Sequence, residues 1–407
     1  MTHQATAIRP FSADPDFDYE LRCALGRSSA GAGDIGEILA AVAGVRKGDH
    51  ESWYEAWAGL AARTLETALS CAAGGHRVSA AGAYLRASSY FSVAVNAVSA
   101  LAESDLLLPA FAEQMRAWRG FVECTDVDAA GVGIPYEGGE LPGWIFRPTG
   151  APVATLVAVN GSDGSMASMW AGCVAPALAR GYNVLVFDGP GQQSELFERG
   201  VPFRPDWEHV LSPVYDFVIG LDGVDPSRVC LYGVSQGSYW AARALAFEHR
   251  FRAAVTDPGV VDVSTSWTSR IPRAMLRLLD EGKDEKFDGE MAFGMRFSAA
   301  TERTWRFRAR PYGTSGYAET LAEVRRYTVA DVAARISTPL LILSPEGEQF
   351  WPGQAEELAG LTGGVSELVE FTDAEGAGEH CQPLAPALAA QRVFDWLDEQ
   401  VGGSGRG

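Results

Sequence analysis

A series of short apolar runs, each followed by a loop and a helical pattern, constrains the fold of this chain more than any other feature. Six such runs cover residues 154–160, 182–188, 228–233, 253–257, 339–344 and 367–371. Buried runs that alternate with helices predict an α/β fold, in which a mostly parallel sheet is covered by helices on both faces. Two further runs, 131–136 and 140–147, surround Gly138-Gly139 and predict a hairpin at the start of this sheet.

The residues before the sheet show only the patterns of helices. Trp53, Trp57 and Leu60 recur at helical spacing, and this pattern stops at Gly74. We expect Ser79 to cap a second helix, and a third helix carries Phe111, Met115, Trp118 and Val122.

These patterns divide the chain into three parts. We predict a helical N-terminal domain over residues 1–122, a sheet domain over 123–401 and a flexible Gly/Ser tail over 402–407. Within the sheet domain, residues 262–335 form a helical insertion between two strands.

Charge and composition exclude several classes of function. The 407 residues contain 33 Lys+Arg and 52 Asp+Glu, which gives a net charge of −19. Phosphates would repel such a chain, so we expect no nucleic-acid partner and no anionic membrane surface. No apolar run approaches the roughly 20 residues of a membrane span, and no signal-peptide core is visible at the N-terminus. These features favour a cytoplasmic protein.

The cysteines and the glycine-rich loops favour chemistry without a cofactor. The six cysteines are scattered without a CxxC pair, which is typical of reduced thiols in a cytosolic protein. No Cys or His pair has the spacing of zinc ligands. The sequence GxxxxGK[ST], which cradles phosphates, does not occur. We therefore expect neither a metal nor a cofactor.

The strongest local signal for catalysis is Gly233-Val-Ser-Gln-Gly237. It follows one of the apolar runs and opens an Ala-rich helical pattern, as a nucleophile elbow requires. Glycines are needed there because a tight, strained turn must expose the serine oxygen. Ser235 is therefore the candidate nucleophile.

A serine hydroxyl needs a base, and a carboxylate must orient that base. His380 lies between the last predicted strand and the final helix, where a loop can return to the sheet edge. Glu348 follows the run at 339–344 and is the favoured acid, with Glu346 and Asp373 as rivals. The order Ser235, Glu348, His380 is the nucleophile–acid–base order expected of this kind of sheet.

An acyl-type transition state also needs N–H donors for its oxyanion. One donor is expected from Gln236, directly after the nucleophile. The other is expected from the loop after residues 154–160, with Ser162 as first choice and Asp163 as second.

On these residues the chain resembles the α/β-hydrolases. More narrowly, it resembles the group with an all-helical N-terminal domain that includes 2,6-dihydroxypseudooxynicotine hydrolase and the fungal heptaketide-shortening hydrolases of melanin synthesis. The motifs that carry the resemblance are Phe187-Asp-Gly-Pro-Gly-Gln192, the Ser235 turn, Ala83-Tyr-Leu-Arg-Ala-Ser-Ser-Tyr90, and the loops of Glu348 and His380.

The resemblance implies a Ser-His-acid enzyme whose helical domain covers the pocket, often as a homodimer. Several members of the group cleave a carbon–carbon bond beside a ketone. Glu348 stands four residues before Pro352, which matches the usual spacing between the acid and a proline in this group. The sequence departs from the group's pattern at Glu348, where Asp is commoner, and at Gln193, where Gly is usual.

Aromatic residues near the candidate site suit a flat substrate. The candidate substrate contacts are Trp170, Tyr239, Trp267 and Trp351. Arg303, Arg306, Arg308 and Arg310 form a basic cluster that can meet a substrate anion, although surface ion pairing is the favoured interpretation.

The sequence therefore favours a serine-dependent hydrolase of a small aromatic or polyketide-like carbonyl compound, with hydrolysis of a C–C bond in a β-dicarbonyl first. An esterase or thioesterase, or an acyl-transferring or cyclising enzyme of secondary metabolism, is the alternative within the same chemistry. A non-catalytic binding or regulatory protein on a hydrolase scaffold is the alternative from another class.

Overall fold

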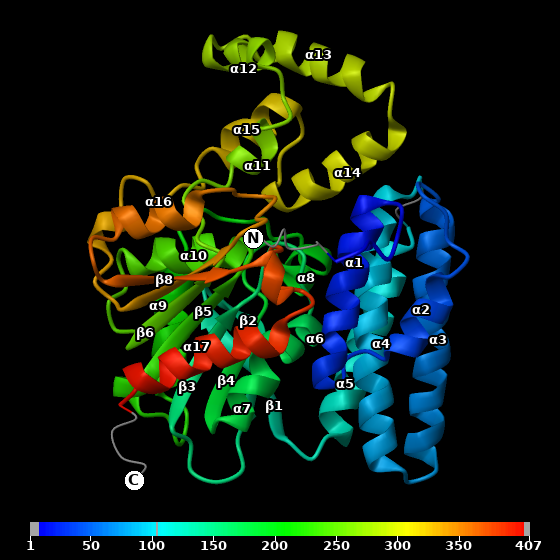
Figure 1. The fold of residues 1–407 in the computed structure, drawn as a ribbon, viewed down its shortest axis with the longest axis vertical. Helices are drawn as coiled ribbons and strands as arrows, with labels where there is room; N and C mark the ends of the chain where they lie inside the picture. The colour runs from blue at the N-terminus through cyan, green and yellow to red at the C-terminus, as the bar shows by residue number, and fades with distance from the viewer. Residues whose placement is uncertain (1–7, 103–104, 403–407) are drawn as a thin grey trace, which may run out of the picture.

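The computed structural model describes residues 8–102 and 105–402 and shows one eight-stranded sheet with helices packed around it (Figure 1). The strands are β1 (Asp128–Tyr136), β2 (Gly139–Arg147), β3 (Ala154–Val159), β4 (Tyr182–Phe187), β5 (Val229–Val234), β6 (Ala253–Asp257), β7 (Leu340–Pro345) and β8 (Ser366–Phe371). Their order is β1-β2-β4-β3-β5-β6-β7-β8. The hairpin β1–β2 joins β4 in antiparallel register, and all later pairs are parallel. The predicted α/β class and the strands β3 to β8 are confirmed, each to within one residue at either end.

Within the described residues, five α-helices precede the sheet and stand beside it as a bundle (Figure 1). They are α1 (Pro15–Gly26), α2 (Ile35–Val42), α3 (His50–Ala73), α4 (Arg77–Ala97) and α5 (Leu107–Cys124). The cap predicted at Ser79 is wrong, because α4 begins two residues earlier. At this start the Arg77 guanidinium donates to the carbonyls of Cys124 and Thr125 at the end of α5.

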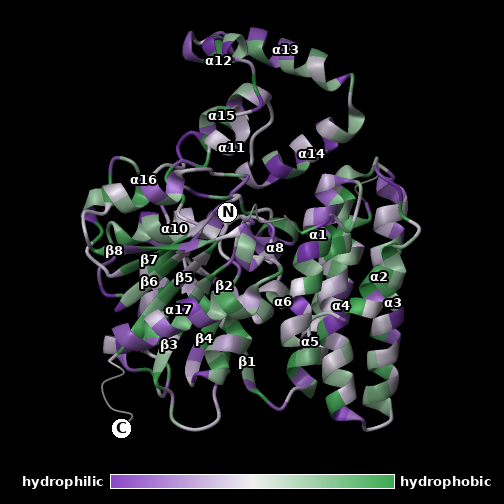
Figure 2. Cartoon of the chain, viewed as in Figure 1, coloured by the Kyte–Doolittle hydropathy of each residue, from purple (hydrophilic) through white to green (hydrophobic). Residues whose placement is uncertain are grey.

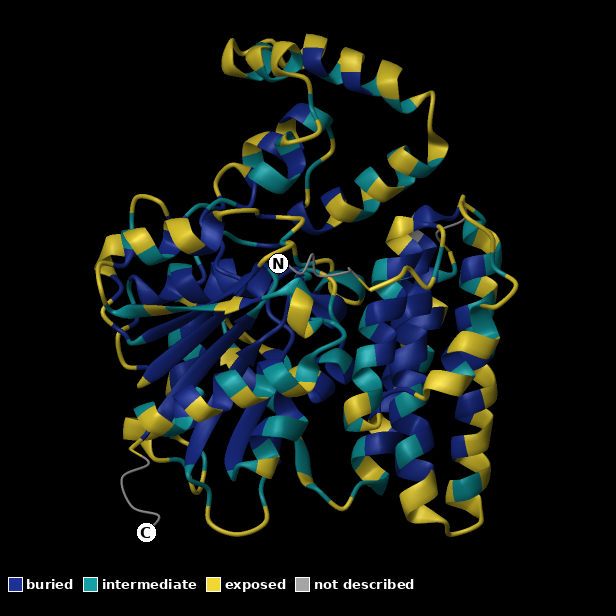
Figure 3. Ribbon diagram, in the orientation of Figure 1, coloured by how far each residue is buried: buried dark blue, intermediate teal, exposed yellow. Residues whose placement is uncertain are grey.

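Helices cover both faces of the sheet. They are α6 (Met166–Met169), α7 (Ala175–Ala179), α8 (Gln193–Phe197), α9 (Glu208–Ile219), α10 (Gln236–Leu245), α16 (Gln354–Leu361) and α17 (Pro386–Gln400). Each of β3, β4 and β5 is buried along most or all of its length, as expected for central parallel strands (Figure 3). The same strands are mostly hydrophobic along their length (Figure 2).

Alternate residues of the strands serve two separate hydrophobic cores. Leu156 and Ala158 pack with α17 and with the five N-terminal helices. Val157 and Val159 pack with α9 and α10 on the opposite face. Because the first core is shared between the bundle and the sheet, the N-terminal helices are packed against the layer that carries the candidate site. The division of the chain into domains at residue 122 stays a prediction.

The insertion before β7 forms α11 (Thr265–Thr268), α12 (Arg273–Asp280), α13 (Asp284–Met295), α14 (Ala299–Ala309) and α15 (Tyr317–Val324). Trp267 of this segment is buried, whereas Phe293 and Phe297 are exposed. Helices α12 and α13 project from the rest of the molecule and are mostly exposed (Figure 3). Among the helices of the described ranges, none combines the length and the apolar character needed to cross a bilayer. Apart from Gly402, the predicted tail lies outside the described residues.

Candidate active site

Ser235 occupies a strained turn between β5 and α10. Its backbone φ of 55° and ψ of −127° are a conformation that residues other than glycine rarely adopt. Two hydrogen bonds hold the turn: the Ser235 N–H donates to the Asp257 carbonyl at 2.6 Å, and the Ser238 hydroxyl donates to the Gly233 carbonyl at 2.9 Å. The turn therefore presents the Ser235 oxygen at the C-terminal end of the sheet.

The two glycines of this turn are required by close approach of the backbone. A Cβ on Gly237 would lie 2.6 Å from the carbonyl oxygens of Val159 and Asn160. A Cβ on Gly233 would overlap the Gly237 backbone. Glycine at both positions thus lets α10 start directly against the end of β3.

The structure brings Ser235, His380 and Glu348 together from three loops. His380 Nε2 lies 2.9 Å from Ser235 Oγ, and His380 Nδ1 lies 2.7 Å from Glu348 Oε2. Ser235 follows β5, Glu348 follows β7, and His380 lies between β8 and α17. Because the carboxyl ends of parallel strands meet at one edge of the sheet, these distant residues become neighbours.

Glu348 is held in its charged form. Its burial favours the neutral acid, but three interactions outweigh burial and lower the pKa of Glu348 below its usual value. These are the contact with His380 and two hydrogen bonds that Glu348 Oε1 accepts from the N–H groups of Phe350 and Trp351, at 2.8 and 3.1 Å. The rivals contact one another instead, since the Asp373 N–H donates to Glu346 Oε2 at 2.9 Å.

A further carboxylate, Asp257, lies beneath the site and was missed by the sequence reasoning. Burial raises the pKa of Asp257 to about 6, while hydrogen bonds from Gln382 at 3.0 Å and Tyr232 at 3.4 Å favour its charged form. Asp257 ends β6, so its place as an acidic residue at a strand end was the signal that could have revealed it. Its carbonyl also accepts from the Cys381 thiol at 3.3 Å, next to His380.

The loop after β3 lies directly against Ser235. A Cβ on Gly161 would lie 2.9 Å from the Ser235 Cβ. The Gln192 amide fixes this loop by donating to the carbonyls of Asn160 and Gly161, at 2.7 and 3.1 Å. In the described part of the chain, the N–H groups of Ser162 and Gln236 have no protein acceptor. The two amide donors that the sequence predicts are thus close to Ser235 and unused.

Gln193 connects this loop to the helical bundle. Its side-chain oxygen accepts from Gln114 of α5 at 2.9 Å, and its amide donates to the Asp163 carbonyl at 3.3 Å. Gln193, Ser162 and Asp163 also line a small cavity. A glycine at position 193 could make neither hydrogen bond, so Gln193 gives the loop a support that the usual residue of the group lacks.

The four predicted substrate contacts fall into two groups. Trp351 lies 5.7 Å from His380 between ring centres, and Trp267 lies edge-on to Tyr312 at 5.6 Å. Trp170 packs on Phe121 and donates to the Ala30 carbonyl, and Tyr239 is fully buried and donates to the Pro205 carbonyl. These partners favour a packing role for Trp170 and Tyr239, and their contact with substrate stays a prediction.

Helix α1 also contributes to the site, which the sequence reasoning did not foresee. The Tyr19 hydroxyl donates to the His380 carbonyl at 3.1 Å, and the Tyr19 ring lies edge-on to Phe350 at 6.0 Å. Phe350 in turn lies edge-on to the His380 ring at 4.8 Å. The signal in the sequence was the Asp14 cap, which starts a helix and places Tyr19 and Cys23 on one face.

Glu20, beside Tyr19, gives a prediction for the pH dependence of stability. Burial and the nearby Asp163 raise the pKa of Glu20 from 4.5 to about 7. Between these values the folded chain holds a proton that the unfolded chain has released, so the free energy of unfolding falls as pH rises from 4.5 to 7. Glu20→Gln should therefore raise the melting temperature at pH 8 by roughly 2 °C and leave it unchanged at about pH 4.5.

Thermal melts of both proteins across this pH range provide the check. Glu66→Gln, the same change at an exposed position of α3, serves as the control and should show no pH-dependent difference from wild type. A constant offset between Glu20→Gln and wild type at every pH would contradict the raised pKa.

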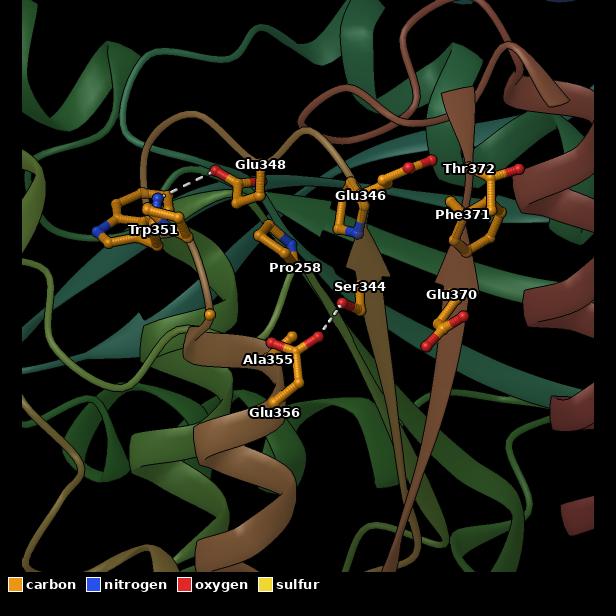
Figure 4. A pocket seen from close by; sticks show the side chains of 13 residues that line it. Pro258, Ser344, Glu346, Glu348, Trp351, Ala355, Glu356, Glu370, Phe371 and Thr372 are labelled. Carbon is orange, nitrogen blue, oxygen red and sulfur yellow. Dashed lines mark hydrogen bonds between the residues drawn. The ribbon is translucent and has the colours of Figure 1, made fainter. Parts of the chain in front are cut away.

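A cavity of about 450 Å³ lies beside the triad, at the ends of β7 and β8 (Figure 4). Its lining includes Glu348, Trp351, Glu356 and Phe371 but neither Ser235 nor His380. Figure 4 shows Glu356 turned toward Ser344, whose hydroxyl donates to it at 2.6 Å. Neither the candidate nucleophile nor its base therefore lines this cavity.

Comparison with known proteins gives consistent results. The alpha/beta hydrolase family matches residues 156–396. Hydrolase LUC6 of Fusarium sp is 30% identical over 95% of this chain and 96% of its own length. The 20-hydroxy-prefusarin hydrolase FUS2 of Gibberella moniliformis is 28% identical over 94% and 96%. The crystal structure of the 2,6-dihydroxy-pseudo-oxynicotine hydrolase has the same fold, with a TM-score of 0.74, 19% identity and coverage of 94% and 97%.

Proposed function

This chain belongs to the alpha/beta hydrolase family, as the resemblance predicted, and we propose that it is a serine-dependent hydrolase of a small carbonyl compound. The observation that carries the proposal is the contact series from Ser235 through His380 to Glu348, at 2.9 and 2.7 Å. A serine in a strained turn, a buried imidazole and a charged carboxylate provide a nucleophile, a base and its orienting partner.

In the first half of the reaction, Ser235 Oγ attacks the substrate carbonyl carbon and its proton passes to His380 Nε2. Glu348 accepts from Nδ1, which fixes the tautomer and stabilises the imidazolium. The N–H groups of Gln236 and Ser162 bind the negative oxygen of the tetrahedral intermediate. When that intermediate collapses, the leaving group takes the proton from His380 and an acyl-enzyme remains.

Water completes the reaction. The water oxygen attacks the acyl carbon while His380 takes one proton from the water. His380 then gives this proton to Ser235 Oγ as the carboxylic acid product leaves. The balance is one carbonyl compound and one water giving one carboxylic acid and one protonated leaving group. This sequence is the same for a carbon, oxygen or sulfur leaving group, so the triad supports each of these reactions.

For the substrate, we propose a small aromatic or polyketide-like compound, with hydrolysis of a C–C bond in a β-dicarbonyl first. The leaving carbon is then an enolate, which is a far better leaving group than a simple carbanion. Trp351, 5.7 Å from His380 between ring centres, and Trp267, beside Tyr312, are the aromatic rings that we propose contact a flat molecule. Relatives over nearly the whole chain include a hydrolase named for 20-hydroxy-prefusarin. Ester or thioester hydrolysis is the alternative with the same acyl-enzyme.

Labelling with a fluorophosphonate tests the serine directly. The reagent phosphonylates an activated serine, so the test can be done before the substrate is identified. We expect stoichiometric labelling of the wild-type protein, and peptide mapping should place the label on Ser235. Ser235→Ala should not be labelled. Ser70→Ala is the control, because it removes an exposed serine hydroxyl from α3, and it should keep the label on Ser235.

A folded wild-type protein whose Ser235 stays unmodified would contradict the proposal and favour a binding protein on a hydrolase scaffold. Once Ser235 is labelled, product analysis with matched β-diketone, ester and thioester panels decides between the reaction classes. A mass gain of one water together with a ketone product would identify C–C hydrolysis.

A further inference from the structure

Arg308, in the last turn of α14, is a cation without a carboxylate partner in the part of the chain that the structure describes. Its guanidinium carbon lies 4.4 Å from the centre of the Trp267 ring, and Nη2 donates weakly to the Ser266 hydroxyl at 3.4 Å. The neighbouring arginines are used differently. Arg306 pairs with Glu302, and Arg303 donates to the Ala100 carbonyl at 2.5 Å.

A short series of contacts connects Arg308 to the nucleophile. The Trp267 ring under Arg308 lies edge-on to Tyr312, with 5.6 Å between ring centres. The Tyr312 hydroxyl lies 3.4 Å from the side-chain oxygen of Gln236, the residue after Ser235. Trp267 and Tyr312 thus form a continuous aromatic wall between Arg308 and the turn of Ser235.

The end of α14 that carries Arg308 borders the oxyanion loop, since Phe307 and Arg310 line a small cavity together with Ser162. Water reaches its side chain, yet the surrounding protein lowers the pKa of the guanidinium through desolvation. Asp163, next to the proposed oxyanion donor Ser162, is near enough to favour the charged form. Arg308 is therefore a solvent-accessible cation on the helix end that borders the oxyanion loop.

A cation in this position has a specific use. An arginine remains charged even when it is partly desolvated, and its planar fork can donate two parallel hydrogen bonds to an anion. Stacking on Trp267 holds one face of the fork and leaves its N–H edges available. With only a weak contact to Ser266, most of its donors remain for a ligand.

We propose that Arg308 binds an anionic oxygen group of the substrate, a carboxylate or the enolate of an acidic 1,3-dicarbonyl. The inference rests on the proposed function and adds the charge of the substrate to it. The flat body of the substrate lies along Trp267 and Tyr312, its carbonyl reaches Ser235 and its anion meets Arg308. The net charge of −19 repels anions from most of the surface, and Arg308 offers a local exception.

Two matched pairs of ligands test this assignment, and the NMR spectra of each titration show whether the ligand stays intact. The carboxylate pair is 2-naphthoate and neutral 2-naphthamide. The enolate pair is 2-phenylcyclohexane-1,3-dione, which is an anion at neutral pH, and its methyl enol ether, which is neutral. Dissociation constants come from NMR titration of the full chain, and protection of Ser235 from fluorophosphonate shows that the ligands bind beside Ser235.

We expect wild type to bind the anionic member of at least one pair about 10- to 100-fold more tightly than the neutral member. Arg308→Gln should reduce this preference to less than about threefold, and Arg308→Lys should retain part of it. Arg306→Gln removes the same charge from the same helix, where the side chain is exposed and paired, and should leave the preference unchanged. The ligand pair whose anion preference is lost in Arg308→Gln shows whether Arg308 binds a carboxylate or an enolate.

Equal binding of both members in wild type, or a preference that survives in Arg308→Gln, would overturn the assignment. Circular dichroism and melting curves of each variant show whether it is folded, and the Lys variant provides a second folded test. A wild-type protein that prefers anions through Arg308 but is never labelled at Ser235 would support this inference and contradict the proposed hydrolase. Normal labelling of Ser235 without a preference for anions would support the proposed hydrolase and contradict the role of Arg308.

Discussion

Glu348→Gln should lower the rate constant for fluorophosphonate labelling of Ser235 by about 1,000- to 10,000-fold, the loss typical of a triad whose acid becomes an amide. The amide cannot neutralise the imidazolium, and its NH₂ group can hold His380 in the wrong tautomer. Quenching the labelling reaction at successive times, over a range of reagent concentrations, measures this rate constant. The geometry should survive, because the new side chain keeps one oxygen that can accept from the N–H groups of Phe350 and Trp351.

The two rival acids serve as controls for this prediction. Glu346→Gln and Asp373→Asn change the same functional group within the neighbouring loops, where the two residues contact each other. Both variants should label within about threefold of wild type, since neither side chain contacts His380. A large loss in either variant, with Glu348→Gln near wild type, would move the role of the acid away from Glu348.

Gly237→Ala should abolish labelling and destabilise the fold. The added methyl group would lie 2.6 Å from two backbone oxygens, of Val159 and Asn160, which cannot rotate away. Separating α10 from β3 costs about 1–3 kcal/mol of unfolding free energy, in the range of overpacked cores. A displacement of about 1 Å between Ser235 and the oxyanion loop should slow labelling at least about 100-fold.

Gly360→Ala is the matched control, because a Cβ at this helical position of α16 meets no atom within 4 Å. This variant should gain up to about 1 kcal/mol from helix propensity and label like wild type. Denaturant unfolding and labelling rates are measured for both variants. A Gly237→Ala protein with wild-type stability and reactivity would show that α10 need not lie directly on the end of β3.

The sheet was predictable because central parallel strands are buried on both faces. Such strands appear in the sequence as uninterrupted apolar runs, so β3 to β7 could be placed within one residue. The order of Ser235, Glu348 and His380 was predictable for a related reason: each follows a strand, and strand ends converge. The start of α4 was misplaced because Ser79 has the residue type of a cap, whereas the helix begins at Arg77 without a side-chain cap.

The walls of the site were harder to predict than its centre. Tyr19 is 361 residues from His380 in sequence, and only the packing of the bundle on the sheet brings α1 to the site. Trp170 and Tyr239 illustrate why aromatic residues are ambiguous in a sequence. The sequence cannot distinguish an aromatic residue that lines the site from one in the hydrophobic core, because the same residue types are buried in both places.

The carbonyl of Asp257 accepts both the Ser235 N–H and the Cys381 thiol. One peptide oxygen at the end of β6 is therefore a common anchor for the nucleophile turn and the histidine turn. When thermal motion displaces this strand end, both turns move with it, and the separation between Ser235 and His380 changes less than the position of either. The separation of the pair is thus kept by one shared anchor, whereas the oxyanion loop is held by other side chains, those of Gln192 and Gln193.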